Sequence, residues 1–136
     1  MIKLIMGVKG TGKTKQLVDL IRTAADETNG SVVCIEKGAK MTYDIPYSVR
    51  LVDASAYGMT GYDYLKGLIS GLHAGNYDIN EVFIDGLLKI VNETYDERCN
   101  EFVQWCETFS EREGVNFTMT VSADIEKATD LMKKYL

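Results

Sequence analysis

The chain has 136 residues, 46% hydrophobic and 26% charged, a composition ordinary for one globular domain. Its net charge is -5, but residues 1–50 hold eight Lys and Arg against five Asp and Glu, so this part is positive. The basic residues form no nucleic-acid-binding cluster, and no segment approaches the roughly 20 apolar residues of a membrane span. Three scattered cysteines and the lack of a targeting segment lead us to expect buried thiols and a cytoplasmic protein.

Strand and helix patterns alternate along the chain. Short apolar runs predict strands at Ile2–Met6, Ser31–Ile35, Val49–Val52, Glu81–Ile84 and Phe117–Val121. Apolar residues at helical spacing predict helices at Lys13–Thr28, within Tyr57–Asn76, from about residue 95 to 113, and at Asp124–Tyr135. Strands that alternate with helices of this size predict a three-layer α/β domain over residues 1–136, with a mainly parallel sheet of about five strands.

The ends of the helix near residues 95–113 are marked by particular residues. Thr94 and Glu97 have the spacing of a capping box, which predicts that the helix begins there. Gly114 follows the last apolar position of the stripe and predicts the end of the helix.

Residues 7–14 match the phosphate-binding pattern G-x-x-x-x-G-K-[ST] in full. They are Gly7, Val8, Lys9, Gly10, Thr11, Gly12, Lys13 and Thr14. Glycines let the backbone coil tightly, so that its N–H groups point at phosphate oxygens. Lys13 can reach the β- and γ-phosphates, and the hydroxyl of Thr14 is suited to ligate Mg²⁺. The motif follows a predicted strand and opens a predicted helix, as this chemistry requires, so we expect bound nucleoside triphosphate and Mg²⁺.

A second pattern, Val82–Asp85, places a carboxylate directly after a buried strand. With the phosphate loop upstream, this pattern resembles the Walker B motif of P-loop NTPases. The resemblance implies a P-loop NTPase fold in which Asp85 holds Mg²⁺ through water and completes the metal shell begun by Thr14. The alternative is a turn aspartate, since Asp85 and Gly86 also form a common turn pair.

Among P-loop proteins the chain resembles a minimal RecA/KaiC-type ATPase core. The D-x-x-G element and the N/T-K-x-D guanine-reading motif of GTPases are both missing, which favours ATP. The resemblance implies that Glu36, at the end of the second strand, polarises the attacking water, and that Lys13 is the other catalytic residue. Glu93 is another candidate, because the residue after Asp85 is glycine rather than glutamate. A polar sensor residue would match Ser122, with Thr120 as the neighbouring option.

The resemblance implies a Mg²⁺-dependent ATPase, or an ATP-driven switch with low intrinsic turnover. Small-molecule kinases of this fold carry an arginine-bearing lid, but the candidates Arg98 and Arg112 lie on an acidic helix whose apolar stripe indicates packing. No arginine finger can be assigned. We therefore expect a protein partner or a neighbouring copy of the chain to supply one. Two alternatives stay open: a nucleotide-binding module without hydrolysis, and a small nucleotide or nucleoside kinase with an acceptor pocket at Tyr57–Asp63.

Overall fold

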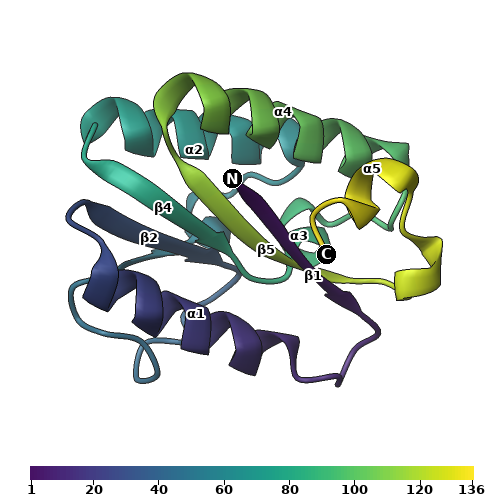
Figure 1. The fold of residues 1–136 in the computed structure, drawn as a ribbon, viewed down its shortest axis with the longest axis horizontal. Helices are drawn as coiled ribbons and strands as arrows, with labels where there is room; N and C mark the ends of the chain where they lie inside the picture. Colours follow the sequence, from purple (N-terminus) through teal and green to yellow (C-terminus); the bar gives the residue numbers. More distant parts are fainter.

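The computed structural model describes residues 1–136 and contains one five-stranded sheet (Figure 1). The strands are β1 (Ile2–Gly7), β2 (Ser31–Glu36), β3 (Arg50–Asp53), β4 (Ile79–Ile84) and β5 (Asn116–Ser122). Their order across the sheet is β1-β5-β4-β2-β3, and every neighbouring pair is parallel. The expected parallel sheet of about five strands is confirmed.

Helices cover both faces of this sheet, which confirms the three-layer α/β fold. The helix α1 (Lys13–Glu27) lies on one face, and α2 (Tyr62–Gly75) and α4 (Glu97–Glu113) lie on the other (Figure 1). The remaining helices are shorter: α3 (Leu87–Val91), α5 (Asp130–Lys133), η1 (Ala54–Tyr57) and η2 (Ile125–Lys127). None of the helices combines the length and the apolar character that a membrane crossing requires.

The strands bury side chains on both faces. In β2, Val33 and Ile35 join a cluster of 26 buried residues that includes side chains of α2 and α4. Their neighbours Val32 and Cys34 point the other way, into a cluster of 9 buried residues that includes side chains of α1. Apolar residues on both faces are typical of a parallel sheet enclosed by helices. All three cysteines are free and buried, as expected: Cys34, Cys99 and Cys106.

The start of α4 differs from the predicted capping box, while its end agrees with the prediction. The N-cap is Asp96, whose carboxylate accepts a hydrogen bond from the backbone N–H of Arg98 at 2.9 Å. An aspartate satisfies a free N–H group as well as threonine does, so the capping residue lies two positions beyond Thr94. Gly114 ends the helix with a φ of 67°, as predicted.

The C-terminal segment is not the single helix that was predicted over Asp124–Tyr135. It forms η2 and then α5, with separate N-caps at Asp124 and Thr129. Each capping residue has a non-helical backbone, so the second cap interrupts the helix. The segment then turns toward the sheet edge, where the carbonyl of Tyr135 accepts a hydrogen bond from the N–H of Leu4 at 2.8 Å.

We predict that Phe102→Ala lowers the free energy of unfolding by about 3–5 kcal/mol. Phe102 is fully buried on α4, and its ring lies 5.6 Å from that of Tyr62 and 6.0 Å from that of Trp105. Urea denaturation measures the effect, with Tyr43→Ala as the control, because Tyr43 is 97% exposed and should change stability by no more than about 0.5 kcal/mol. Equal effects of the two substitutions would contradict the packing of α4 on the sheet.

Candidate functional site

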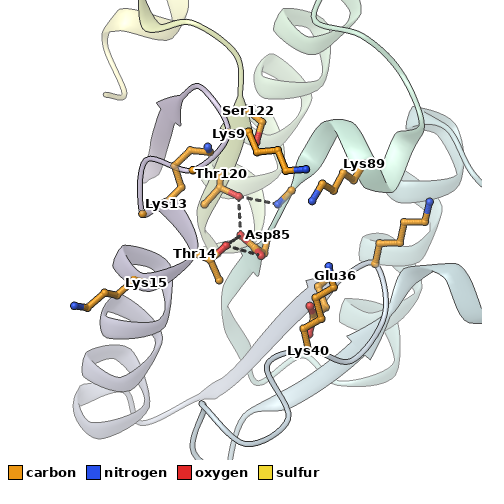
Figure 2. A pocket seen from close by; sticks show the side chains of 14 residues that line it. Lys9, Lys13, Thr14, Lys15, Glu36, Lys40, Asp85, Lys89, Thr120 and Ser122 are labelled. Atoms are coloured by element: carbon orange, nitrogen blue, oxygen red, sulfur yellow. Dashed lines mark hydrogen bonds between the residues drawn. The ribbon is translucent and has the colours of Figure 1, made fainter.

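A polar pocket lies at the carboxyl edge of the sheet. Because the strands are parallel, the residues that end or follow β1, β2, β4 and β5 meet at this edge. The pocket has a volume of about 310 Å³, and none of its 14 lining residues is hydrophobic (Figure 2). They are Lys9, Gly10, Gly12, Lys13, Thr14, Lys15, Glu36, Lys37, Lys40, Asp85, Gly86, Lys89, Thr120 and Ser122.

The loop between β1 and α1 forms one wall of the pocket. Gly10 and Gly12 have φ angles of 87° and 80°, a left-handed region that side chains with a Cβ rarely adopt. These two positions therefore explain why the loop contains glycine. Five of the eight motif residues line the pocket: Lys9, Gly10, Gly12, Lys13 and Thr14.

The other three motif residues, Gly7, Val8 and Thr11, shape the loop from outside the pocket. Gly7 ends β1. The carbonyl of Val8 accepts a hydrogen bond from the hydroxyl of Thr11 at 2.8 Å and another from Nζ of Lys13 at 2.9 Å. The ammonium group of Lys13 is thus folded back onto its own loop, where an anion in the pocket would compete with a neutral carbonyl.

The first turn of α1 faces this loop with its N–H groups uncapped. Gly12 is the N-cap and makes no side-chain hydrogen bond, and the first turn contains no acidic residue. The first N–H groups of a helix have no partner within the helix, and the helix dipole makes this end attractive to anions. Together with the glycine loop, this end of α1 can bind a phosphate group.

A hydroxyl and a carboxylate meet across the pocket floor. The hydroxyl of Thr14 lies 3.2 Å from Oδ2 and 3.3 Å from Oδ1 of Asp85. Thr120, on the intervening strand β5, donates to Oδ1 of Asp85 at 2.8 Å and accepts from the N–H of Gly86 at 2.7 Å. Thr120 therefore fixes the orientation of the carboxylate. The oxygen pair of Thr14 and Asp85 suits a hard cation such as Mg²⁺.

Glu36 is the buried acid of the pocket. It is 3% exposed, and its Oε2 accepts a hydrogen bond from the N–H of Met41 at 2.9 Å. Burial raises the pKa of Glu36 above its usual value, and the charge of Asp85 adds to the rise, although the bond from Met41 opposes it. A carboxylate with a raised pKa is a stronger base than an ordinary glutamate.

The alternative acid, Glu93, does not line this pocket. Its carboxylate pairs with Arg98 at 2.7 Å, and the same guanidinium also pairs with Asp96 at 2.8 Å. Arg112 pairs with Glu113 at 3.1 Å and lies over the ring of Phe109. Of the two glutamates considered from the sequence, only Glu36 reaches the pocket, and neither arginine of α4 does.

Four lysines in the pocket were not predicted from the sequence: Lys15, Lys37, Lys40 and Lys89. Lys37 follows β2, and Lys89 lies four residues after Asp85, so both come from segments that leave the carboxyl edge. The rule that placed Asp85 there would also have placed these lysines, had it been applied to residues beyond each strand end. Ser122, the predicted sensor position, lines the pocket, while its neighbouring option Thr120 contacts Asp85.

The comparisons with known proteins add no family assignment. No protein-family model matches the chain, and no curated protein matches it. Its function must therefore be argued from the pocket itself.

We predict that Glu36→Gln stabilises the protein increasingly as pH rises. A raised pKa in the folded state means that folding favours the protonated carboxyl, so the stability of the parent protein falls as pH rises from the unfolded pKa through the folded pKa. Glutamine carries no titrating group and keeps an oxygen for the N–H of Met41. Urea denaturation from about pH 4 to about pH 8 in chelator-containing buffer measures the difference.

The control for this experiment is Glu101→Gln, which removes an exposed carboxylate on α4. It should show no comparable change with pH. A stability difference between Glu36→Gln and the parent that stays constant across this range would contradict the raised pKa.

Proposed function

We propose that the chain binds a nucleoside triphosphate together with Mg²⁺ in this pocket, with ATP as the preferred nucleotide. The observation that carries the proposal is the 3.2 Å approach of Thr14, the last residue of the phosphate-binding motif, to the carboxylate of Asp85. These two residues lie 71 positions apart in the chain and supply the oxygen ligands that Mg²⁺ prefers. A pocket without hydrophobic lining also suits a triphosphate rather than an apolar ligand.

The residues present fit the triphosphate and the metal ion. The left-handed Gly10 and Gly12 allow backbone N–H groups to approach phosphate oxygens, and Lys13 can exchange the carbonyl of Val8 for one of them. Thr14 and Asp85 would hold Mg²⁺, Asp85 through water as the resemblance implies. When bound, the ion neutralises charge on the phosphate oxygens. A volume of about 310 Å³ lies at the small end for ligand pockets, which fits phosphates with the base outside.

We further propose slow ATP hydrolysis, with Glu36 as the base. Its carboxylate would take a proton from water as the water oxygen bonds to the terminal phosphorus. The bond to the bridging oxygen breaks, and its electron pair leaves with ADP. Two features favour low turnover: Glu36 is buried against Met41, and no arginine lines the pocket. These features equally support an ATP-driven switch, or a binding module without hydrolysis.

A partner protein, or a second copy of the chain, would respond to the difference between the ATP and ADP states. We place the protein in the cytoplasm, where ATP is available and thiols remain reduced. Its three cysteines are free and buried, which accords with that compartment.

A recess beside the pocket favours phosphoryl transfer as a second candidate function. It has a volume of about 240 Å³ and is lined by Ser55, Gly58 and Thr60, and by Lys37 and Lys89, which also line the main pocket. Part of it therefore overlaps the Tyr57–Asp63 segment expected to hold an acceptor. The tyrosines of this region have other positions: Tyr57 is exposed, while the hydroxyl of Tyr64 donates to the carbonyl of Ala54. A panel of nucleosides and nucleotides that accept no phosphate would exclude this function.

We predict that Lys13→Ala abolishes nucleotide binding, because its ammonium group is the part of the motif that reaches the phosphates. Calorimetric titration with ATP, ADP and GTP, each with and without Mg²⁺, measures binding in the parent and the variant, and released phosphate is assayed in the same samples. Lys3→Ala, an exposed lysine of β1, serves as the control. Micromolar affinity in Lys13→Ala, or no binding by the parent, would contradict the proposed function.

We predict that Asp85→Asn retains ATP binding but loses the gain in affinity that Mg²⁺ provides. Asparagine keeps an oxygen that can accept from Thr120, so the fold around the site is preserved, while the charge that attracts the cation is removed. Titrations at several Mg²⁺ concentrations measure the effect, with Asp19→Asn on the exposed part of α1 as the control. An unchanged Mg²⁺ dependence would assign the metal to other groups.

A further inference from the structure

The pocket contains more positive charge than its own carboxylates balance. Six of the fourteen lining residues are lysines, against two carboxylates, although the whole chain has a net charge of -5. None of the four ion pairs in the structure includes a lysine of this pocket. Lys13 alone among the six donates a side-chain hydrogen bond within the protein. Like charges gathered in one pocket repel each other, so the arrangement favours an anionic ligand.

These lysines come from two opposite sides of Asp85. In the strand order β1-β5-β4-β2, the phosphate loop follows β1, Asp85 follows β4, and Lys37 follows β2. Asp85 therefore lies between the phosphate loop and Lys37 along the edge. Figure 2 shows the same arrangement for Lys89, which lies across Asp85 from Lys13.

The direction of Lys89 follows from the packing of α3. Leu87, Ile90 and Val91 are buried and form the inner face of this short helix, so Lys89 lies on its outer face. The Lys89 side chain passes over Gly86, where its Cδ would lie 3.7 Å from an added Cβ. In Figure 2 its ammonium group and that of Lys9 point toward one another from opposite rims of the pocket.

Hydrogen bonds made by the two chain neighbours of Lys37 fix the backbone around it. The N–H of Gly38 donates to Oδ1 of Asp53 at 2.8 Å, and Glu36, just before Lys37, accepts from Met41. Lys37 and Lys89 also line the adjoining recess together, so the two residues form one boundary between the pocket and that recess.

We propose that Lys37 and Lys89 form a second phosphate-binding wall, which faces the phosphate loop and binds the terminal phosphate of the nucleotide. This inference rests on the proposed function, in which Thr14 and Asp85 would hold Mg²⁺ and the ion would neutralise charge on the phosphate oxygens near Asp85. Since the loop lies on one side of Asp85, a terminal phosphate bound near Asp85 faces the two lysines on the other side. The chain thereby recognises the triphosphate by residues of its own, without an arginine supplied by a partner.

The wall makes the site selective for the triphosphate over the diphosphate. A hydrogen bond to a charged group contributes about 1.5–3 kcal/mol, which corresponds to roughly a 10- to 150-fold change in affinity. ADP has no terminal phosphate to contact the wall, so removal of the lysines should weaken ATP binding and leave ADP binding nearly unchanged.

The test compares the affinities for ADP and for a non-hydrolysable ATP analogue, both with Mg²⁺, by calorimetry. The variant is Lys37→Ala/Lys89→Ala, and the matched control is Lys3→Ala/Lys66→Ala, which removes the same charge outside the pocket. We expect the variant to lose about 10-fold or more of the preference for the ATP analogue, with ADP affinity within about threefold of the parent. Lys37→Arg/Lys89→Arg should keep the preference.

The outcomes separate this inference from the proposed function. One outcome is that the parent binds nucleotide while the double alanine variant keeps its preference for the ATP analogue over ADP, or loses no more of it than the control does. That result would overturn the lysine wall and leave the proposed binding of nucleotide by the phosphate loop intact. An equal loss of affinity for ADP and the analogue would assign the lysines to general attraction of anions and would also overturn the wall. If the parent binds neither nucleotide, both proposals fail.

Discussion

The parallel pairing of β5 between β1 and β4 is the constraint on which the site depends. It places the β1–α1 loop and Asp85 two strands apart, with Thr120 of the intervening strand in contact with Asp85. Thr120 contacts both the carboxylate of Asp85 and the N–H of Gly86, so a single hydroxyl holds the side chain and directs the chain into α3. The position of Lys89 on α3 therefore depends on the same strand order.

On the other side of Asp85, the position of the Glu36 side chain depends on the segment after β2, which contains Met41. The side chain of Met41 is 1% exposed and packs in the smaller core cluster, while its N–H donates to Glu36. Core packing on the α1 face and the position of the proposed base are thus coupled through one residue. Release of this hydrogen bond would free the carboxylate of Glu36 for its proposed role as a base.

The sequence was sufficient for features that depend on local spacing. The motif at residues 7–14 is continuous in the chain, and Asp85 follows a recognisable buried strand, so their meeting at the carboxyl edge could be predicted without knowledge of the strand order. The same rule could have placed Lys37 and Lys89 at this edge, but their position on one side of Asp85 depends on the pairing of β2 with β4, which the sequence does not reveal. The separate caps at Asp124 and Thr129 were also missed, since apolar spacing does not reveal where a backbone leaves the helical conformation.

The positively charged first part of the sequence supplies most of the lysines of this pocket. The positive balance of residues 1–50 is concentrated there by Lys9, Lys13, Lys15, Lys37 and Lys40, to which α3 adds Lys89. Like charges gathered in one pocket repel each other, and a bound anion would reduce that repulsion. Ligand binding and folding stability are therefore linked, because a ligand that binds only the folded chain stabilises it. If the chain binds nucleotide as proposed, binding would therefore raise the free energy of unfolding.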